Sequence, residues 1–260
     1  MGTKAVQGKL WSTAPNYWSS YFEPYFLPMY RKTIDQLNLT GDSVLLDAGC
    51  GSGLFSSMSI KAGAQVVGMD AAPGLLEVAR KRNPENTFLE EDLETMPFCD
   101  ESFDVVTGFN SFQYAGNFTR ALMEAKRVLK TGGKLVIGIW DKPEMSEASN
   151  VLKAIAALVP RPYTGTARPF VFSENGKIER ICESIGLKML LKTNAECPFI
   201  YTSLSHGINS FMGTEPAATA LHYSDRSVLE EVLGNAFKPF LITDDIYFLK
   251  NNFLIFIAEK

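Results

Sequence analysis

A glycine-rich turn follows an apolar run in the first quarter of the chain. It reads Leu45-Leu46-Asp47-Ala48-Gly49-Cys50-Gly51-Ser52-Gly53, and a helical pattern starts directly after it. Glycines let a backbone approach a ligand closely, and the N-terminus of a helix favours a negatively charged group. The turn therefore predicts a binding site for a small ligand.

The spacing of the glycines narrows the ligand class. A dinucleotide fingerprint that starts at Gly49 needs its third glycine at position 54, where this chain has Leu54. The turn also lacks the Gly-Lys-Ser of a nucleoside triphosphate loop. The pattern thus argues against an NAD-dependent oxidoreductase, which is kept only as a weaker alternative.

Two acidic residues downstream could complete an adenosine site. Asp70 ends the second apolar run, and a carboxylate there can accept hydrogen bonds from ribose hydroxyls. The competing interpretation is an Asp that caps the next helix. The glycine turn upstream favours ribose binding by Asp70 over this cap. Asp92 ends the acidic run Glu90-Glu91-Asp92, which a solvated stretch would also explain.

Alternating strand and helix patterns place these residues in an α/β fold. We expect five strands and three helices in the first half of the chain. The strands are 44–46, 65–69, 87–89, 103–109 and 134–140, and the helices are 54–62, 73–82 and 117–129. Such alternation indicates a doubly wound, mostly parallel sheet with helices on both faces. In the second half we expect helices at 146–159, after Ser173, at 203–212 and at 227–237, and strands at 187–193 and 253–258.

Several segments together resemble class I S-adenosylmethionine-dependent methyltransferases, and most of all the ubiquinone/menaquinone-biosynthesis branch (methyltransferase type 11). These segments are 44–53, 67–80, 88–98, 102–109 and 121–139. The resemblance implies a seven-stranded Rossmann-like sheet in which the final strand, 253–258, runs antiparallel and pairs with 187–193. Two positions depart from the family pattern, because Ala72 stands where Ser is frequent and Glu91 where Gly is frequent.

The resemblance also implies the cofactor and the residues that bind it. The cofactor would be S-adenosylmethionine, with S-adenosylhomocysteine as product. The glycine turn would line its methionine part, Asp70 would take the ribose, and Asp92 the adenine amino group. The implied cofactor-binding set is Asp47, Gly49, Cys50, Gly51, Gly53, Asp70, Ala71, Asp92, Leu93, Asn110 and Gln113.

The acceptor of the methyl group is not encoded in a motif. Holding a nucleophile in line supplies much of the rate of such a displacement, and a base is needed only if the acceptor must lose a proton. The family branch shares no catalytic base, so the catalytic residues are unknown at this stage. Residues that could contact the acceptor, each also explained by packing, are Tyr17, Trp18, Tyr21, Tyr114 and His206.

Three parts of the chain have different expected roles. Residues 1–40 are an aromatic helical segment, 41–196 and 246–260 the cofactor-binding core, and 197–245 an insertion. We expect the aromatic stretch 11–30 and the insertion to cover the cofactor and form a pocket for an apolar or aromatic small molecule. Packing of helices or a dimer interface would explain the same residues, and the oligomeric state is left open.

Composition limits the other function classes. The net charge is −4 and no dense basic run occurs, so a nucleic-acid substrate is disfavoured. The four cysteines and two histidines lack metal-ligand spacing, so no metal is expected. The N-terminus lacks the apolar stretch of a signal peptide, and no apolar run is long enough to span a bilayer, so we expect a cytoplasmic enzyme. The main alternative is a non-catalytic S-adenosylmethionine-binding protein with the same fold.

Overall fold

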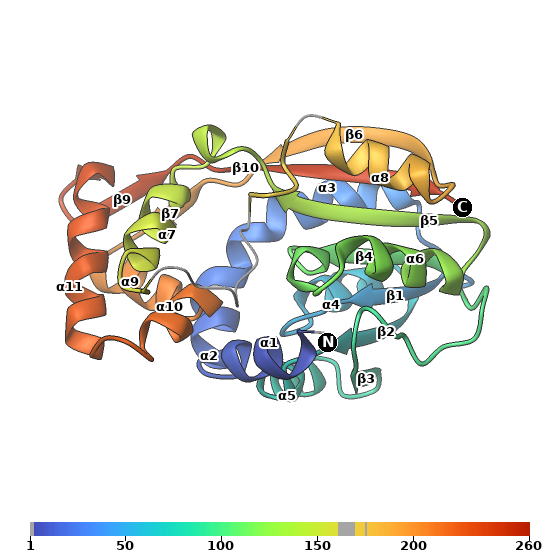
Figure 1. Cartoon of the computed structure of the whole chain (residues 1–260), viewed down its shortest axis with the longest axis horizontal. Coiled ribbons are helices and arrows are strands. Elements are labelled where there is room, and N and C mark those ends of the chain that lie inside the picture. Colours follow the sequence, from blue (N-terminus) through green and yellow to red (C-terminus); the bar gives the residue numbers. More distant parts are fainter. Residues whose placement is uncertain (1–2, 161–169, 175) are drawn as a thin grey trace.

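The larger of two sheets carries the strands that the sequence pattern predicted. The computed structural model describes residues 3–160, 170–174 and 176–260. In it, seven strands pair in the order β3-β2-β1-β4-β5-β10-β6 (Figure 1). They are β1 (Val44–Ala48), β2 (Gln65–Asp70), β3 (Thr87–Glu90), β4 (Phe103–Phe109), β5 (Leu129–Trp140), β6 (Lys188–Glu196) and β10 (Asn252–Glu259).

Strand direction also agrees with the prediction. β1 to β5 run parallel to one another, whereas β10 runs antiparallel to both β5 and β6. The sheet is therefore mostly parallel with one antiparallel strand, and the expected pairing of the last strand with the 187–193 segment is confirmed.

Helices bury both faces of this sheet. Successive side chains of a strand point to opposite faces, and adjacent residues Leu45 and Leu46 of β1 are both fully buried but belong to two different hydrophobic clusters. One cluster draws on α3 (Leu27–Leu37), α4 (Leu54–Lys61) and α5 (Pro73–Arg82). The other draws on α6 (Phe118–Val128) and α8 (Lys177–Ser184).

Local signals explain where two of these helices begin. The side chain of Asn117 accepts a hydrogen bond from the backbone N–H of Arg120, so Asn117 caps α6 as predicted. The cap expected at Ser173 is not observed. Helix α8 starts at Lys177 after Gly176, which has a left-handed φ of 72°, and the Ser173 hydroxyl instead donates to the carbonyl of Phe170.

The N-terminal aromatic segment forms short, irregular helices. They are α1 (Lys4–Trp11), α2 (Pro15–Tyr17), the π-helical turn η1 (Trp18–Phe22) and the 3₁₀ turn η2 (Glu23–Phe26), which leads into α3. Pro24 and Pro28 each lie at the first or second position of a new helix, where a missing N–H costs nothing.

A second, smaller sheet lies between β6 and β10 in the sequence. Its antiparallel strands are β7 (Phe199–Tyr201), β9 (Ile246–Leu249) and β8 (Leu241–Thr243). Figure 1 shows it at one end of the molecule with α9 (Leu204–Met212), α10 (Glu215–Ala220) and α11 (Arg226–Phe237). Helix α7 (Ala148–Ala156) packs on α10 and α11, and three 3₁₀ turns complete the assignment: η3 (Phe112–Tyr114), η4 (Pro143–Met145) and η5 (Lys238–Phe240). The segment 246–249, which we assigned to the core, thus pairs within this smaller sheet.

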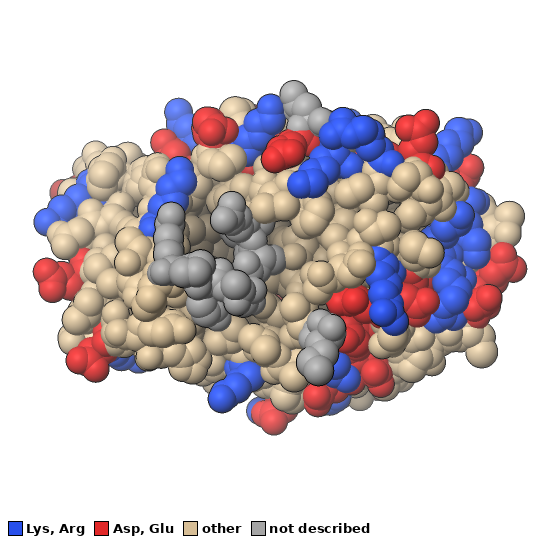
Figure 2. Space-filling view, in the orientation of Figure 1, with Lys and Arg blue, Asp and Glu red and all other residues tan. Residues whose placement is uncertain are grey.

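Charges are mixed on the surface. On the face shown in Figure 2, acidic and basic side chains alternate around the rim, and most of the middle is uncharged. Neither sign gathers into a broad patch among the described residues of this view, which is in keeping with the small net charge of −4.

Candidate functional site

The glycine turn is shaped by backbone hydrogen bonds. The N–H groups of Gly49 and Cys50 both donate to the carbonyl of Met69 at the end of β2, at 2.7 and 2.9 Å. Gly49 has a φ of +81°, and a Cβ there would lie 2.2 Å from the Cβ of Ser111. Only glycine therefore fits this position without a shift of the Ser111 backbone.

Asp70 fastens the turn from the neighbouring strand end. One carboxylate oxygen accepts from the N–H of Gly51 and the other from the N–H of Ala72, both at 2.8 Å. Burial raises the pKa of Asp70, and these backbone hydrogen bonds oppose the rise. Each oxygen keeps a free lone pair, and Asp70 lines a cavity above the turn, so it can accept further hydrogen bonds from a ligand.

Asp47 lies beneath the turn. Its carboxylate accepts from the hydroxyl of Ser56 at 2.6 Å and from that of Thr107 at 3.1 Å, and the residue is 2% exposed. Burial raises its pKa to about 6. Asp47 does not line the cavity, so in this structure it supports the turn from below.

The cavity above the turn, here called the cofactor cavity, holds about 680 Å³ including open solvent. Seven predicted residues line it: Gly49, Gly51, Asp70, Ala71, Asp92, Leu93 and Asn110. Four predicted residues do not: Asp47, Cys50, Gly53 and Gln113. The lining set therefore joins the carboxyl ends of β1, β2 and β4 with the loop after β3, which is where doubly wound folds bind ligands.

Helix α1 lines this cavity with Lys4, Gln7 and Trp11. It belongs to the segment 1–40 that we expected as a lid candidate, but a helix at these residues was not predicted. The Lys4 ammonium donates to the carbonyl of Glu90 at 2.9 Å, and the Thr3 hydroxyl donates to the carbonyl of Tyr114. A Cβ on Gly8 would lie 2.1 Å from the carbonyl oxygen of Ala71. The glycine inside this helix thus allows the helix to touch the β2 loop, and it is the one signal in the sequence that could have revealed the contact.

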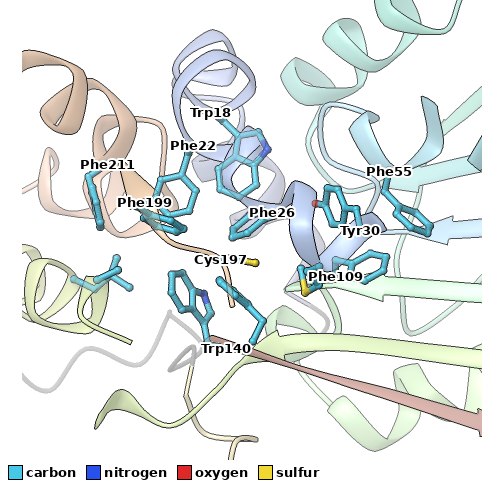
Figure 3. Close-up of a cluster of buried hydrophobic side chains, with 14 of the residues drawn as sticks. Trp18, Phe22, Phe26, Tyr30, Phe55, Phe109, Trp140, Cys197, Phe199 and Phe211 are labelled. Carbon is cyan, nitrogen blue, oxygen red and sulfur yellow. The ribbon is translucent and has the colours of Figure 1, made fainter. Parts of the chain in front are cut away.

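A second cavity, here called the aromatic cavity, adjoins the first. It holds about 350 Å³ including open solvent and is lined mostly by apolar side chains. Its lining residues are Trp11, Trp18, Phe22, Phe26, Asn110, Tyr114, Trp140, Leu152, Thr214 and Pro216. Figure 3 shows the wider cluster, in which Trp18, Phe22 and Phe26 of the N-terminal segment face Trp140 and Phe199. Trp11, Trp18, Asn110 and Tyr114 line both cavities, so these four residues mark their boundary.

The predicted acceptor residues separate into two groups. Trp18 and Tyr114 lie at the boundary between the cavities. Tyr17, Tyr21 and His206 line neither cavity, and they lie in a chain of ring contacts with centroid distances of 5.8 Å (Tyr17–Tyr21) and 5.6 Å (Tyr21–His206). Partial burial lowers the pKa of His206, so the neutral ring is favoured.

Glu215 is a buried acid that no sequence pattern revealed. It is 1% exposed, and the two residues beside it, Thr214 and Pro216, line the aromatic cavity. Burial raises its pKa to about 7, while a hydrogen bond from the Thr219 hydroxyl opposes the rise. Burial raises the pKa of Tyr114, and the charge of Glu215 adds to the rise.

The described part of the chain also bears on metal binding and membrane insertion. No group of three or more His, Cys, Asp and Glu side chains there is arranged to hold a metal ion. Among the same residues, no helix has the length and apolar character needed to cross a membrane.

Known proteins resemble this chain mainly over the part that contains β1 to β5. Residues 46–137 match the family described as "Methyltransferase domain". This part of the chain is therefore similar to methyltransferase domains. A demethylmenaquinone methyltransferase of Renibacterium salmoninarum is 32% identical over 136 residues, which are 50% of this chain and 57% of that protein. A malonyl-[acyl-carrier protein] O-methyltransferase of Serratia marcescens is 39% identical over 111 residues, 43% of this chain and 44% of that one. The chain thus spans about half the length of these relatives.

Solved structures share the fold of this methyltransferase domain over a longer stretch. The YcgJ protein of Bacillus subtilis has a TM-score of 0.60 at 20% identity, with 89% of this chain and 97% of that chain covered. Geranyl diphosphate C-methyltransferase of Streptomyces coelicolor, in complex with Mg²⁺, a geranyl thiolodiphosphate and S-adenosyl-L-homocysteine, has a TM-score of 0.53 at 16% identity. That match covers 89% of this chain and 74% of that chain. At these identities the likeness shows the fold alone.

Proposed function

We propose that this protein transfers a methyl group from S-adenosylmethionine to a small, largely apolar or aromatic molecule. The observation that carries the proposal is the shared boundary of Trp11, Trp18, Asn110 and Tyr114 between the cofactor cavity and the aromatic cavity. Two ligands bound in these cavities would meet at that boundary, as a direct transfer between them requires.

The residues of the cofactor cavity suit S-adenosylmethionine. Bare glycine backbone at Gly49 and Gly51, a carboxylate at Asp70 and another at Asp92 match the methionine, ribose and adenine parts in turn. Asn110 and Trp18 each carry a buried N–H without a partner among the described residues, which a polar ligand would satisfy. When bound, this cofactor supplies a methyl group activated by a sulfonium.

The chain itself contributes positioning and exclusion of water. The aromatic rings of Trp11, Trp18 and Trp140 would hold a flat or apolar acceptor against the boundary, and the roof formed by α1 would shield the reacting atoms from solvent.

Calorimetry tests the cofactor assignment. We expect the protein to bind S-adenosylmethionine and S-adenosylhomocysteine without added metal, and to bind NAD at least a hundredfold more weakly. Absence of binding by both sulfur compounds contradicts the proposal. Binding without formation of S-adenosylhomocysteine for any apolar or aromatic acceptor would instead favour a non-catalytic cofactor-binding protein of this fold.

Hydrogen exchange tests the lid. We expect S-adenosylhomocysteine to slow amide exchange in residues 4–26 and 204–220, because α1, η1, α9 and α10 pack together over the two cavities. The exposed strand β8 is the internal control and should not respond. Unchanged exchange in both segments would mean that they are fixed parts of the core.

A further inference from the structure

The side chain of Trp18 has an unusual environment. It lies at the first position of the π-helical turn η1, it is 9% exposed, and it lines both the cofactor cavity and the aromatic cavity. Its indole nitrogen Nε1 is buried and has no hydrogen-bond partner among the described residues. Because a buried indole N–H is normally hydrogen-bonded, a ligand atom is the expected partner.

The position of this N–H points to one end of the cofactor cavity. A Cβ on Gly51 would lie 3.5 Å from Trp18 Nε1. Gly51 lines the cavity in a left-handed conformation, with a φ of +54°, and its own N–H is already taken by Asp70. The indole N–H therefore lies at the glycine turn, away from the Asp92 end.

The basic side chains near the glycine turn are already paired with other groups. Lys4 is the one Lys or Arg among the described residues that line the cofactor cavity, and its ammonium is bound to the Glu90 carbonyl and lies 3.7 Å from the Glu91 carboxylate. Arg82 approaches the turn at Ser52, but its guanidinium is paired with one carboxylate oxygen of Glu23. The other oxygen of Glu23 lies 3.8 Å from the same Cβ position on Gly51, so the ion pair leaves no free positive charge for a ligand there. A carboxylate at the glycine turn would thus have to be bound largely by uncharged N–H groups.

We propose that the Trp18 indole N–H donates a hydrogen bond to the carboxylate of the amino-acid part of bound S-adenosylmethionine. The inference rests on the proposed function, since it assumes that this cofactor occupies the cavity. It assigns Trp18 two roles: its N–H recognises the cofactor, and its ring forms a wall of the aromatic cavity.

A pair of ligands isolates this hydrogen bond. S-adenosylhomocysteine and 5′-methylthioadenosine share the adenosine and the thioether, but 5′-methylthioadenosine lacks the amino-acid part. Trp18→Phe removes the N–H and keeps a flat ring against Phe22 and Trp11, whose centroids lie 5.2 and 4.8 Å from that of Trp18. We expect this variant to bind S-adenosylhomocysteine about tenfold or more weakly, the loss of one hydrogen bond to a charged acceptor, and 5′-methylthioadenosine within twofold of wild type.

Trp11→Phe is the matched control, because Trp11 lines the same two cavities. It should show no selective loss for S-adenosylhomocysteine. Equal losses of both ligands in Trp18→Phe would make Trp18 a packing residue and overturn the inference, as would no loss at all. If the wild-type protein binds neither ligand, the proposed function itself is wrong. If the wild-type protein binds both ligands and Trp18→Phe shows no selective loss, only the role of Trp18 is wrong.

A second measurement needs no folded variant at position 18. The chain has three tryptophans, so its ¹⁵N spectrum holds three indole N–H signals. The Trp11→Phe and Trp140→Phe variants each remove one signal, and the signal that remains in both belongs to Trp18. We expect the Trp18 signal to move downfield with S-adenosylhomocysteine and to move much less with 5′-methylthioadenosine. Equal shifts with both ligands would contradict a bond to the carboxylate.

Discussion

The guanidinium of Arg82, on α5, lies 2.7 Å from the carboxylate of Glu23, which the N-terminal segment buries against the glycine turn. The same carboxylate accepts from the hydroxyl of Ser52, and Arg82 also donates to the Ser52 carbonyl at 2.9 Å. Burial raises the pKa of Glu23, and the Arg82 charge opposes the rise. This ion pair thus joins the N-terminal segment, the turn and α5.

Removing Arg82 should leave a buried carboxylate without its cation. We expect Arg82→Ala to lower the free energy of unfolding by about 3–5 kcal/mol, measured by urea denaturation at pH 7. The control is Glu230→Ala, which breaks an exposed pair with Arg226 and should cost about 0.3–0.5 kcal/mol. Similar small losses in both variants would mean that the Glu23 pair does not hold the segment in place.

Two glycines with nearly the same backbone conformation allow the cost of a left-handed residue to be measured apart from the cost of a steric clash. Gly49 and Gly132 have φ values of +81° and +78°, but a Cβ on Gly49 meets Ser111 at 2.2 Å, whereas a Cβ on Gly132 meets nothing within 4 Å. We expect Gly132→Ala to cost about 1–2 kcal/mol from the left-handed conformation alone. Gly49→Ala should cost clearly more and should also abolish binding of S-adenosylhomocysteine. Equal losses of unfolding free energy in the two variants would show that Ser111 can move aside without cost.

Asp70 is expected to bind the ribose as well as the turn. Asp70→Ala removes charge-assisted hydrogen bonds of about 1.5–3 kcal/mol each, so calorimetry should show at least a tenfold loss of affinity for S-adenosylhomocysteine. Asp100→Ala is the control, because that side chain is 75% exposed and pairs with Arg127, a residue that does not line the cofactor cavity. Unchanged affinity in a folded Asp70→Ala variant would reduce Asp70 to a cap of α5.

Glu215 should make stability depend on pH. Its pKa is about 7 in the fold against an ordinary 4.5, so the folded state holds the proton more tightly than the unfolded chain does. The stability from this group is present below pH 4.5 and is lost as the pH rises through 7. We expect Glu215→Gln to gain stability relative to wild type over that range, by up to roughly 3 kcal/mol.

The comparison with wild type matters here, because burial also raises the pKa of Asp47 and Asp70. Unfolding free energies of both proteins at pH 5 and pH 8 give the difference that belongs to Glu215. Exposed Glu230→Gln should show the same small difference at both pH values. If the difference in unfolding free energy between Glu215→Gln and wild type is the same at pH 5 and pH 8, the carboxyl is solvated in the protein.

Much of the fold could be predicted because both faces of the sheet leave a mark in the sequence. Runs such as Val44–Leu46 are apolar at every position, since Leu45 and Leu46 enter different clusters. The ends of β1, β2 and β4 then followed from the residues that interrupt the runs, and Asp47, Asp70 and Asn110 were expected at one edge for that reason. Asp70 and Asn110 line the cavity at that edge, whereas Asp47 lies beneath the turn.

The features that could not be predicted have sequence patterns that are short or that mix polar and apolar residues. Helix α1 buries Gln7, Gly8 and Leu10, and a buried Gln and Gly do not register as an apolar face. The strands of the smaller sheet have three or four residues, too few to show alternation. Glu215 is one acid before a Pro-Ala run, and only the packing of α10 against α1 and α7 reveals its burial.

The smaller sheet and its helices are an excursion from one hairpin of the large sheet. Asn252 pairs with Glu196, so the two ends of the segment 197–251 are held side by side by β6 and β10. A loop whose ends are already fixed can change in length and sequence at little cost to the sheet. We therefore expect that this segment can be exchanged for another with little loss of stability in the large sheet. If the proposed function holds, such an exchange would change which acceptors are methylated and leave cofactor binding intact.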